Sequence, residues 1–351
     1  MRLTQRISSA LLGLAVATGA MTTAAGAAQA ATPAAAVERP LANAPSVVSS
    51  AAYLMDAESG EVHFSKEADL RRPVASLTKA MTAYTVLKQA KPTDKVTITA
   101  EDVEYGSQGG ASVAHLRAGD TLTVENLLYG LMLPSGADAA HALARAYGPG
   151  VPGFVAEMND TARKLGMTDT VYVNADGMPY QGGGHSTARD QATLAKATLD
   201  DPTLKKITST RYHAVESTSE HGSYAWKNTN RLLSAPGALG VKTGYTRDAG
   251  YTLAFAGERD GNRLVGVILG ETDSGRRFQT AQALLDWGAR GQPIGPFPAC
   301  CLGRCGLVAA GAARSASVEN GACGRFVRHA PTRRSQVQAP ASKGKRWWSR
   351  C

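Results

Sequence analysis

The chain has 351 residues and a formal net charge of +9, with 43% hydrophobic and only 6% aromatic residues. This apolar content suffices for a folded core, whereas the shortage of aromatic side chains argues against a stacking platform for single-stranded nucleic acid. The charge excess lies in residues 291–351, which hold ten basic residues and one acidic residue, while residues 1–290 hold 28 of each. A basic groove on the main body is therefore not indicated. All five cysteines follow residue 299, which excludes a cysteine nucleophile, a cysteine-ligated zinc and a disulfide framework from that body.

The first 30 residues have the features of a secretory signal peptide. Arg2 and Arg6 precede a short apolar run at residues 10–20, and Ala28-Gln29-Ala30 forms a small-x-small cleavage site. The apolar run is far shorter than the roughly 20 residues that span a bilayer, and no other segment reaches that length. We therefore expect export without a transmembrane anchor, with an uncleaved anchor or a buried helix as the weaker alternative. Residues 31–46 are expected to form a flexible spacer.

Residues 47–290 are expected to form one domain with strands at both ends and helices between them. In chain order the periodicity predicts strands at 51–56 and 61–64, helices at 76–90, 123–132, 138–147 and 187–199, strands at 239–243, 251–256 and 264–270, and a helix at 276–289. The last two strands join across Asp260-Gly261-Asn262, which is a hairpin turn signal. This order predicts an α/β (α+β) fold whose sheet is built from both ends of the domain and carries an inserted helical region.

The first candidate for catalytic chemistry is Ser76-Leu77-Thr78-Lys79. Residues i and i+3 of a helix share a face, so the Lys79 amine is expected beside the Ser76 hydroxyl. A lysine whose pKa is lowered by burial can take the proton of a serine and make it a nucleophile. Taken alone, the pattern is more typical of a capping serine beside a surface lysine.

Two further motifs offer a hydroxyl and a carboxylate site. Pro134-Ser135-Gly136 interrupts two helices, and such a corner would expose the Ser135 hydroxyl for a proton relay. Lys242-Thr243-Gly244 ends a predicted strand. There Lys242 offers a cation and Thr243 a hydroxyl, and Gly244 would let a substrate backbone approach the strand. A plain helix–loop–helix corner and an ordinary strand end are the respective alternatives.

The three motifs together, in this order, are the set found in penicillin-binding proteins and class A β-lactamases. The chain resembles the serine D-alanyl-D-alanine carboxypeptidases, the low-molecular-mass penicillin-binding proteins. The resemblance covers about residues 46–290 and includes the segments 72–83, 131–140, 154–158, 165–167, 174–177, 185–190, 228–233 and 240–246.

This resemblance implies a β-lactamase/DD-peptidase-like fold with a central antiparallel sheet flanked by helices. Ser76 would attack the carbonyl between the two terminal D-alanines of a peptidoglycan stem peptide, with Lys79 as general base and Ser135 as proton relay. Lys242 and Thr243 would hold the terminal carboxylate. Backbone N–H groups of Ser76 and Tyr245 would form the oxyanion hole. It also implies inhibition by β-lactam antibiotics, which would be trapped at the same serine, and association with the cell wall.

One departure from the family pattern leaves alternatives open. Ala137 stands where the family usually has an asparagine, whose amide bonds the lysine region and the substrate. A D,D-transpeptidase and a non-catalytic wall-binding or penicillin-binding protein therefore remain alternatives to the carboxypeptidase. A class A β-lactamase is disfavoured because residues 150–190 lack a Glu-x-x-Leu-Asn loop. The histidines show no metal-binding spacing, so we expect neither a metal nor a cofactor, nor a nucleic-acid partner.

Residues 291–351 change character abruptly, because arginine and cysteine appear and the hydrophobic periodicity is lost. We expect this Cys/Arg-rich tail to be disordered, and an out-of-frame translation product is one explanation for its composition. A functional basic tail attracted to anionic wall polymers is the alternative.

Overall fold

The computed structural model describes residues 44–180 and 182–290. The predicted signal peptide, residues 31–43 of the predicted spacer and the tail after residue 290 lie outside this range. Within the described residues, none of the helices combines the length and the apolar composition that a membrane span requires.

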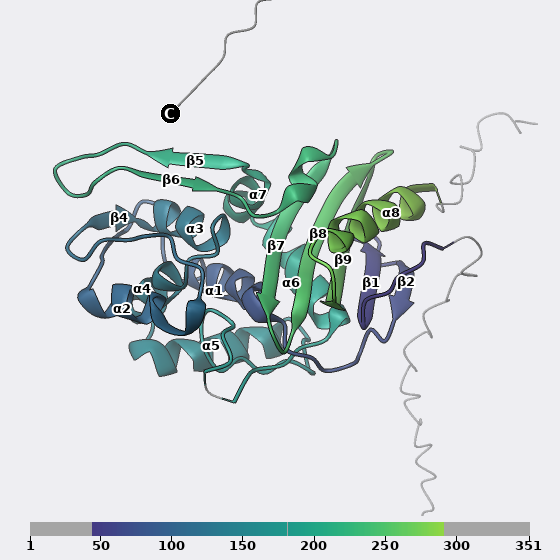
Figure 1. Cartoon of the computed structure of the whole chain (residues 1–351), viewed down its shortest axis with the longest axis horizontal. Helices are drawn as coiled ribbons and strands as arrows, with labels where there is room; N and C mark the ends of the chain where they lie inside the picture. The colour runs from purple at the N-terminus through teal and green to yellow at the C-terminus, as the bar shows by residue number, and fades with distance from the viewer. Residues whose placement is uncertain (1–43, 181, 291–351) are drawn as a thin grey trace, which may run out of the picture. The chain divides into compact units, whose positions relative to one another are not determined.

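A five-stranded antiparallel sheet with the strand order β2-β1-β9-β8-β7 forms one side of the domain (Figure 1). The strands are β1 (Ala51–Asp56), β2 (Val62–Lys66), β7 (Ala238–Thr246), β8 (Gly250–Arg259) and β9 (Asn262–Glu271). Because β1 pairs with β9, the two ends of the domain meet in one sheet, which confirms the predicted architecture. In the described chain β7 pairs only with β8, so its other edge is free of strand pairing.

The hairpin between β8 and β9 confirms the predicted turn. Asp260 and Gly261 have positive φ angles of 49° and 81°. Two consecutive residues with positive φ match the twist of the flanking strands, and aspartate followed by glycine is a favoured sequence for such a turn.

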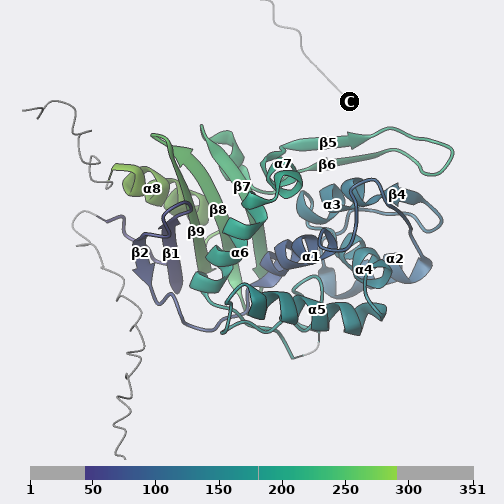
Figure 2. The ribbon, with the colours of Figure 1, turned by 180° about the vertical axis from the view of Figure 1, so that it is seen from behind.

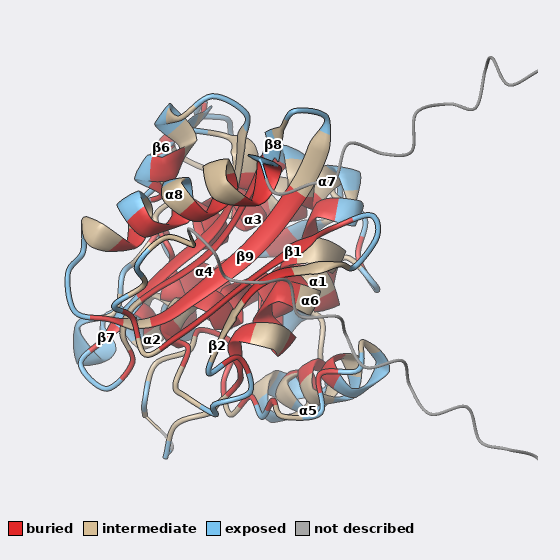
Figure 3. Cartoon of the chain, turned by 90° about the vertical axis from the view of Figure 1, so that its right-hand side faces the viewer, coloured by how far each residue is buried: buried red, intermediate tan, exposed pale blue. Residues whose placement is uncertain are grey.

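Helices cover both faces of the sheet. Helix α8 (Arg276–Arg290) lies on the face towards the viewer in Figure 1, and α6 (Ala188–Asp200) lies on the face seen in Figure 2. Alternate residues of β9 serve the two layers, since Val265 and Val267 pack with α6 while Leu264 and Ile268 pack with α8. Figure 3 shows these strands buried between the helices. Coverage on both faces explains why the inner strands β1, β8 and β9 are mostly apolar.

The inserted region is mainly helical and has its own core, in which Met81, Leu131 and Phe154 are fully buried. Its helices are the 3-10 turn η1 (Ala75–Leu77), α1 (Thr78–Val86), α2 (Ala100–Gly106), η2 (Gln108–Gly110), α3 (Val124–Met132), α4 (Ala137–Ala146), α5 (Gly150–Lys164), α7 (Pro202–Ser209) and η3 (Arg231–Ser234). Two two-stranded antiparallel sheets accompany them, β3 (Lys95–Thr97) with β4 (Thr121–Thr123) and β5 (Tyr212–Val215) with β6 (Tyr224–Lys227).

The predicted helix starts are confirmed at Thr123 and Thr187. Each threonine side chain accepts a hydrogen bond from the backbone N–H three residues later, at 3.2 Å and 3.0 Å. The helix predicted at 76–90 is shorter, because α1 ends at Val86 and the next residues form turns. Strands β3 to β6 and helices α2, α5 and α7 were not predicted.

Candidate active site

Ser76 lies in η1, immediately before α1, and Lys79 lies in the first turn of that helix. The Lys79 Nζ is 3.2 Å from the Ser76 Oγ, so the predicted juxtaposition of amine and hydroxyl is confirmed. This is the spacing at which a base can accept the proton of a nucleophile.

The Lys79 side chain is only 1% exposed, and its amine also donates a hydrogen bond to the Asp176 carbonyl oxygen at 2.8 Å. Burial lowers the pKa of Lys79, and the negative charges of Asp176 and Asp138 partly oppose that effect. A lysine with a lowered pKa exists more often as the neutral amine, which is the form that can act as a base.

The loop that carries Asp176 fits closely against the nucleophile segment. Ala75, directly before Ser76, has a positive φ of 52°, an uncommon conformation for a residue with a Cβ. Gly177 has a φ of +82°, and a Cβ on it would lie 2.0 Å from the Ala75 carbonyl oxygen. Only glycine therefore allows this approach, which places the Asp176 carbonyl at Lys79.

Ser135 occupies the predicted corner between α3 and α4, but the expected exposure of its hydroxyl is wrong. The residue is 6% exposed, and its Oγ is buried without a hydrogen-bond partner among the described residues. The corner is tightly packed, since a Cβ on Gly136 would lie 2.8 Å from both the Ala114 Cβ and the Gly130 oxygen. Ser135 nevertheless lines the same cavity as Ser76. A buried hydroxyl without a partner is suited to receive a proton from a ligand.

Strand β7 carries Lys242, whose side chain is 1% exposed and whose Nζ donates to the Thr243 carbonyl oxygen at 2.9 Å. Burial, followed by the positive charges of Lys79 and Arg277, holds the pKa of Lys242 well below its ordinary value. The Thr243 and Thr229 hydroxyl oxygens are 2.7 Å apart. The two threonine hydroxyls and the nearby Arg277 guanidinium thus lie around one region with the two buried amines, and the hydroxyls and the guanidinium favour a bound anion.

Gly244 lies in the site, and the structure gives a second reason for glycine at this position. A Cβ on Gly244 would lie 2.3 Å from the Thr252 Oγ1 and 3.0 Å from the Ser76 backbone nitrogen. Glycine is therefore required for β7 to approach the nucleophile segment, whereas its predicted contact with the substrate backbone stays a prediction. The next residue, Tyr245, is 54% exposed, and its ring stacks on Tyr251 at 4.4 Å between ring centroids.

A cavity of about 560 Å³, here called the main cleft, brings together five of the predicted residues. They are Ser76, Ser135, Thr243, Gly244 and Tyr245. Lys79 lies behind the cleft wall and reaches it through the Ser76 hydroxyl. Lys242 is likewise buried beneath Thr243.

Arg277, which no sequence motif indicated, also lines the main cleft. Its Nη1 donates to the Gly244 oxygen at 2.8 Å and to the Thr252 oxygen at 3.0 Å, whereas its Nε is buried without a partner among the described residues. Burial, with a smaller contribution from Arg231, lowers the pKa of Arg277 to about 10, so the guanidinium is charged at neutral pH. An arginine in the first turn of a helix gives no sequence signal of such a role.

Residues 38–273 match the Peptidase S11 family, described as D-alanyl-D-alanine carboxypeptidase. The chain belongs to this family. A D-alanyl-D-alanine carboxypeptidase of Streptomyces strain K15 is 38% identical over 271 residues, which cover 74% of this chain and 91% of that protein. D-alanyl-D-alanine carboxypeptidase DacC of Escherichia coli is 37% identical over 258 residues, and there the match spans 70% of this chain but 62% of the relative.

Solved structures agree with this assignment. The structure of the Streptomyces K15 DD-transpeptidase superposes with a TM-score of 0.67 at 38% identity, covering 70% of this chain and 98% of that one. A D-alanyl-D-alanine carboxypeptidase from Mycobacterium tuberculosis superposes with a TM-score of 0.67 at 31% identity, covering 74% and 96%. The predicted DD-peptidase-like fold and the enzyme class, a serine-type D-alanyl-D-alanine carboxypeptidase, are thereby confirmed.

Proposed function

We propose that this enzyme is exported and removes the terminal D-alanine of peptidoglycan stem peptides through an acyl-enzyme on Ser76. The observation that carries the mechanism is the 3.2 Å approach of the Lys79 Nζ to the Ser76 Oγ, in a site where burial lowers the pKa of the amine. The signal-peptide features of residues 1–30 support export, and the family's substrate supports a location at the cell wall.

Acylation begins when neutral Lys79 takes the proton of the Ser76 hydroxyl. The Oγ attacks the carbonyl between the two D-alanines, and the negative charge on the carbonyl oxygen is stabilised by the backbone N–H groups of Ser76 and Tyr245. One such donor is typically worth about 3 kcal/mol. The close approach of β7 to the Ser76 nitrogen at Gly244 supports this pairing of donors. Ser135, whose buried hydroxyl has no partner among the described residues, acts as a relay: it gives its proton to the D-alanine amine as the peptide bond breaks, and takes up the proton that Lys79 removed from Ser76.

The terminal carboxylate of the substrate binds beside Thr243 and Arg277, with Lys242 beneath them. The guanidinium is charged at neutral pH, and the Thr243 hydroxyl is held by Thr229 at 2.7 Å. With the carboxylate near Thr243 and the reacting carbonyl near Tyr245, the peptide runs antiparallel to the free edge of β7. This is the strand-addition mode of peptide recognition.

The acyl-enzyme can then react with water or with an amine. Reaction with water makes the enzyme a carboxypeptidase, and reaction with an amine makes it a transpeptidase. Ala137 begins α4, is fully buried and carries only a methyl group where the family pattern has an amide. A buried polar partner is typically worth about 1–3 kcal/mol, so its replacement is expected to alter the rate of this step. The transpeptidase name of the K15 structure makes this the second candidate function.

The test incubates the purified chain with a diacetyl-Lys-D-Ala-D-Ala peptide and with fluorescent penicillin, beside Ser76→Ala. Release of D-alanine together with stable penicillin labelling, both lost in Ser76→Ala, is the expected result. If penicillin labels the enzyme but D-alanine is released only when an amine acceptor is added, the result would favour the transpeptidase. Labelling without turnover under either condition would favour a non-catalytic penicillin-binding protein.

A further inference from the structure

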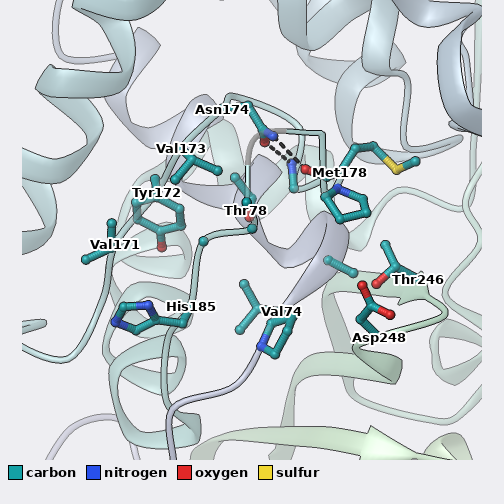
Figure 4. Close-up of a pocket in the computed structure, with 17 residues that line it drawn as sticks. Val74, Thr78, Val171, Tyr172, Val173, Asn174, Met178, His185, Thr246 and Asp248 are labelled. Atoms are coloured by element: carbon teal, nitrogen blue, oxygen red, sulfur yellow. Dashed lines mark hydrogen bonds between the residues drawn. The ribbon is translucent and has the colours of Figure 1, made fainter.

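A cavity between α1 and α5 lies apart from the catalytic region, and we call it the α1–α5 cavity. These two helices pack against each other (Figures 1 and 2). The cavity shown in Figure 4 extends the main cleft, because Thr246 and Asp248 line both. The α1–α5 cavity shares none of its described lining residues with either of them. Its volume of about 430 Å³ is within the range of small-molecule sites.

One wall of the α1–α5 cavity holds a polar group without a partner. Thr85 of α1 lines the cavity and is 2% exposed, and its Oγ1 makes no hydrogen bond to any described residue. A buried threonine in a helix can place its hydroxyl on the carbonyl four residues earlier, as Thr198 does on the Leu194 oxygen at 2.8 Å. Because an unsatisfied buried hydroxyl costs free energy, a ligand that accepts its proton is favoured at Thr85.

The wall formed by α5 already binds an amide. Glu157 accepts a hydrogen bond from the side-chain amide of Gln89, which lies in the turn after α1, and both residues line the cavity. Gln89 is exposed, so an incoming amide N–H can replace its side chain at the Glu157 carboxylate. The cavity therefore offers a hydroxyl donor from α1 and a carboxylate acceptor from α5. An acetamide group carries the two complementary atoms, and its planar trans amide points them in opposite directions.

The rest of the lining favours a ligand without net charge. Two basic and two acidic side chains line the cavity, so their formal charges cancel. They are Lys88, Lys164, Glu157 and Asp160. Tyr84 and Leu165 add apolar surface, and Thr161 adds a second hydroxyl. A tyrosine combines an apolar ring with a polar tip, which suits the C–H faces and the hydroxyls of a sugar.

We propose that the α1–α5 cavity binds a neutral saccharide that carries acetamide groups. The Thr85 hydroxyl donates to an acetamide carbonyl, and the Glu157 carboxylate accepts from the acetamide N–H. Binding does not depend on the proposed function. Only the source of the saccharide rests on that function, because the stem peptides of the proposed substrate are attached to glycan strands with acetamide groups.

Isothermal titration of the purified chain with tetra-N-acetylchitotetraose tests the site. Saturable binding is expected in the wild type and equally in Ser76→Ala. Cellotetraose has the same linkage but hydroxyls in place of the acetamides, so it should bind about tenfold more weakly. Thr85→Val keeps the shape of the side chain and should weaken binding of the chitotetraose by about two- to tenfold, as the loss of one hydrogen bond requires. Thr161→Phe fills the cavity from α5 and should abolish binding.

Thr198→Val is the matched control, since Thr198 is also a buried helical threonine but lies outside the cavity. It loses a hydrogen bond, so its free energy of unfolding should fall while chitotetraose binding stays intact. Thr85→Val should show the opposite pattern, with no loss of stability and weaker binding. The inference is overturned if the wild type shows no saturable binding up to about 10 mM chitotetraose or binds cellotetraose equally well. Wild-type affinity in either Thr85→Val or Thr161→Phe would overturn it too. Failure of the wild type to release D-alanine from the peptide would instead overturn the proposed function and leave the saccharide site standing.

Discussion

Replacing Gly177 with alanine tests how tightly the loop at Asp176 constrains the nucleophile. The new Cβ would lie 2.0 Å from the Ala75 oxygen, 2.5 Å from the Ala75 carbonyl carbon and 2.8 Å from the Thr78 Oγ1. Non-bonded carbon atoms pack at about 3.5–4.0 Å, so one of the two segments must move by about 1 Å or more. Either movement disturbs the site. A shift of Ala75 displaces Ser76, and a shift of the loop takes the Asp176 carbonyl from Lys79.

The magnitude follows from two contributions. The φ of +82° costs a residue with a Cβ about 1–2 kcal/mol, and overpacking costs about 1–3 kcal/mol more. We therefore expect Gly177→Ala to lower the free energy of unfolding by about 2–5 kcal/mol. A misplacement of about 1 Å in a catalytic group costs about 100-fold in rate, so acylation by fluorescent penicillin should fall by about that factor.

Gly166→Ala is the matched control for this experiment. Gly166 has a φ of +79°, but a Cβ there meets no atom within 4 Å. The free energy of unfolding of Gly166→Ala, measured in urea, should therefore fall only by the cost of the positive φ, about 1–2 kcal/mol. This variant should be acylated at the wild-type rate. If Gly177→Ala acylates within about threefold of the wild type while remaining folded, the proposed constraint on Ser76 is incorrect.

Asp176→Asn removes an anion that opposes the lowered pKa of Lys79 but keeps the backbone carbonyl. The amine becomes neutral at lower pH, so the acid limb of the acylation rate should move to lower pH, and an unmoved limb would contradict this. Asp102→Asn tests stability. Burial acts to raise the pKa of Asp102, but hydrogen bonds from His141 and Arg145 hold it well below its usual range. The contribution of Asp102 to the free energy of unfolding is fully present above the ordinary carboxyl pKa of about 3.9. It is lost as the pH falls towards the lowered pKa of Asp102 in the folded protein. The variant should lose about 3 kcal/mol in urea unfolding at pH 7, and this gap should narrow below pH 4. Equal gaps at pH 3 and pH 7 would refute the argument.

Elements with long apolar runs were predictable from the sequence because the local pattern of hydrophobic residues indicates which of them are buried. Strand β1 spans the predicted residues 51–56, since it is buried along its whole length. Helix α5 escaped prediction because it begins with Gly150-Val151-Pro152-Gly153, which contains poor helix formers, and buries only Phe154, Met158 and Ala162. Strands β3 to β6 escaped prediction because each has only three or four residues, which is too few for an alternating pattern to stand out.

In the site, too, residues that are close in sequence were predictable, whereas residues that only the fold brings together were not. Ser76 and Lys79 could be paired from sequence because a spacing of three residues fixes their approach. Asp176 and Arg277 could not, because their positions depend on a loop 97 residues from Lys79 and on the packing of α8 against β7 and β8. The tight packing of the corner at Ser135 was missed for a similar reason, since the Ala114 side chain that packs against Gly136 is distant in sequence.

Recognition of the substrate carboxylate is shared between two cations that respond differently to pH. The pKa of Lys242 is held well below its ordinary value by burial and by its cationic neighbours, whereas that of Arg277 is lowered only to about 10. As pH rises, Lys242 loses its proton first and Arg277 carries more of the interaction. Arg277→Gln should therefore raise the KM for diacetyl-Lys-D-Ala-D-Ala by a larger factor at pH 9 than at pH 6. Parallel KM profiles for the variant and the wild type across this range would show that the charge of Lys242 does not change there, and would contradict the shared role of the two cations.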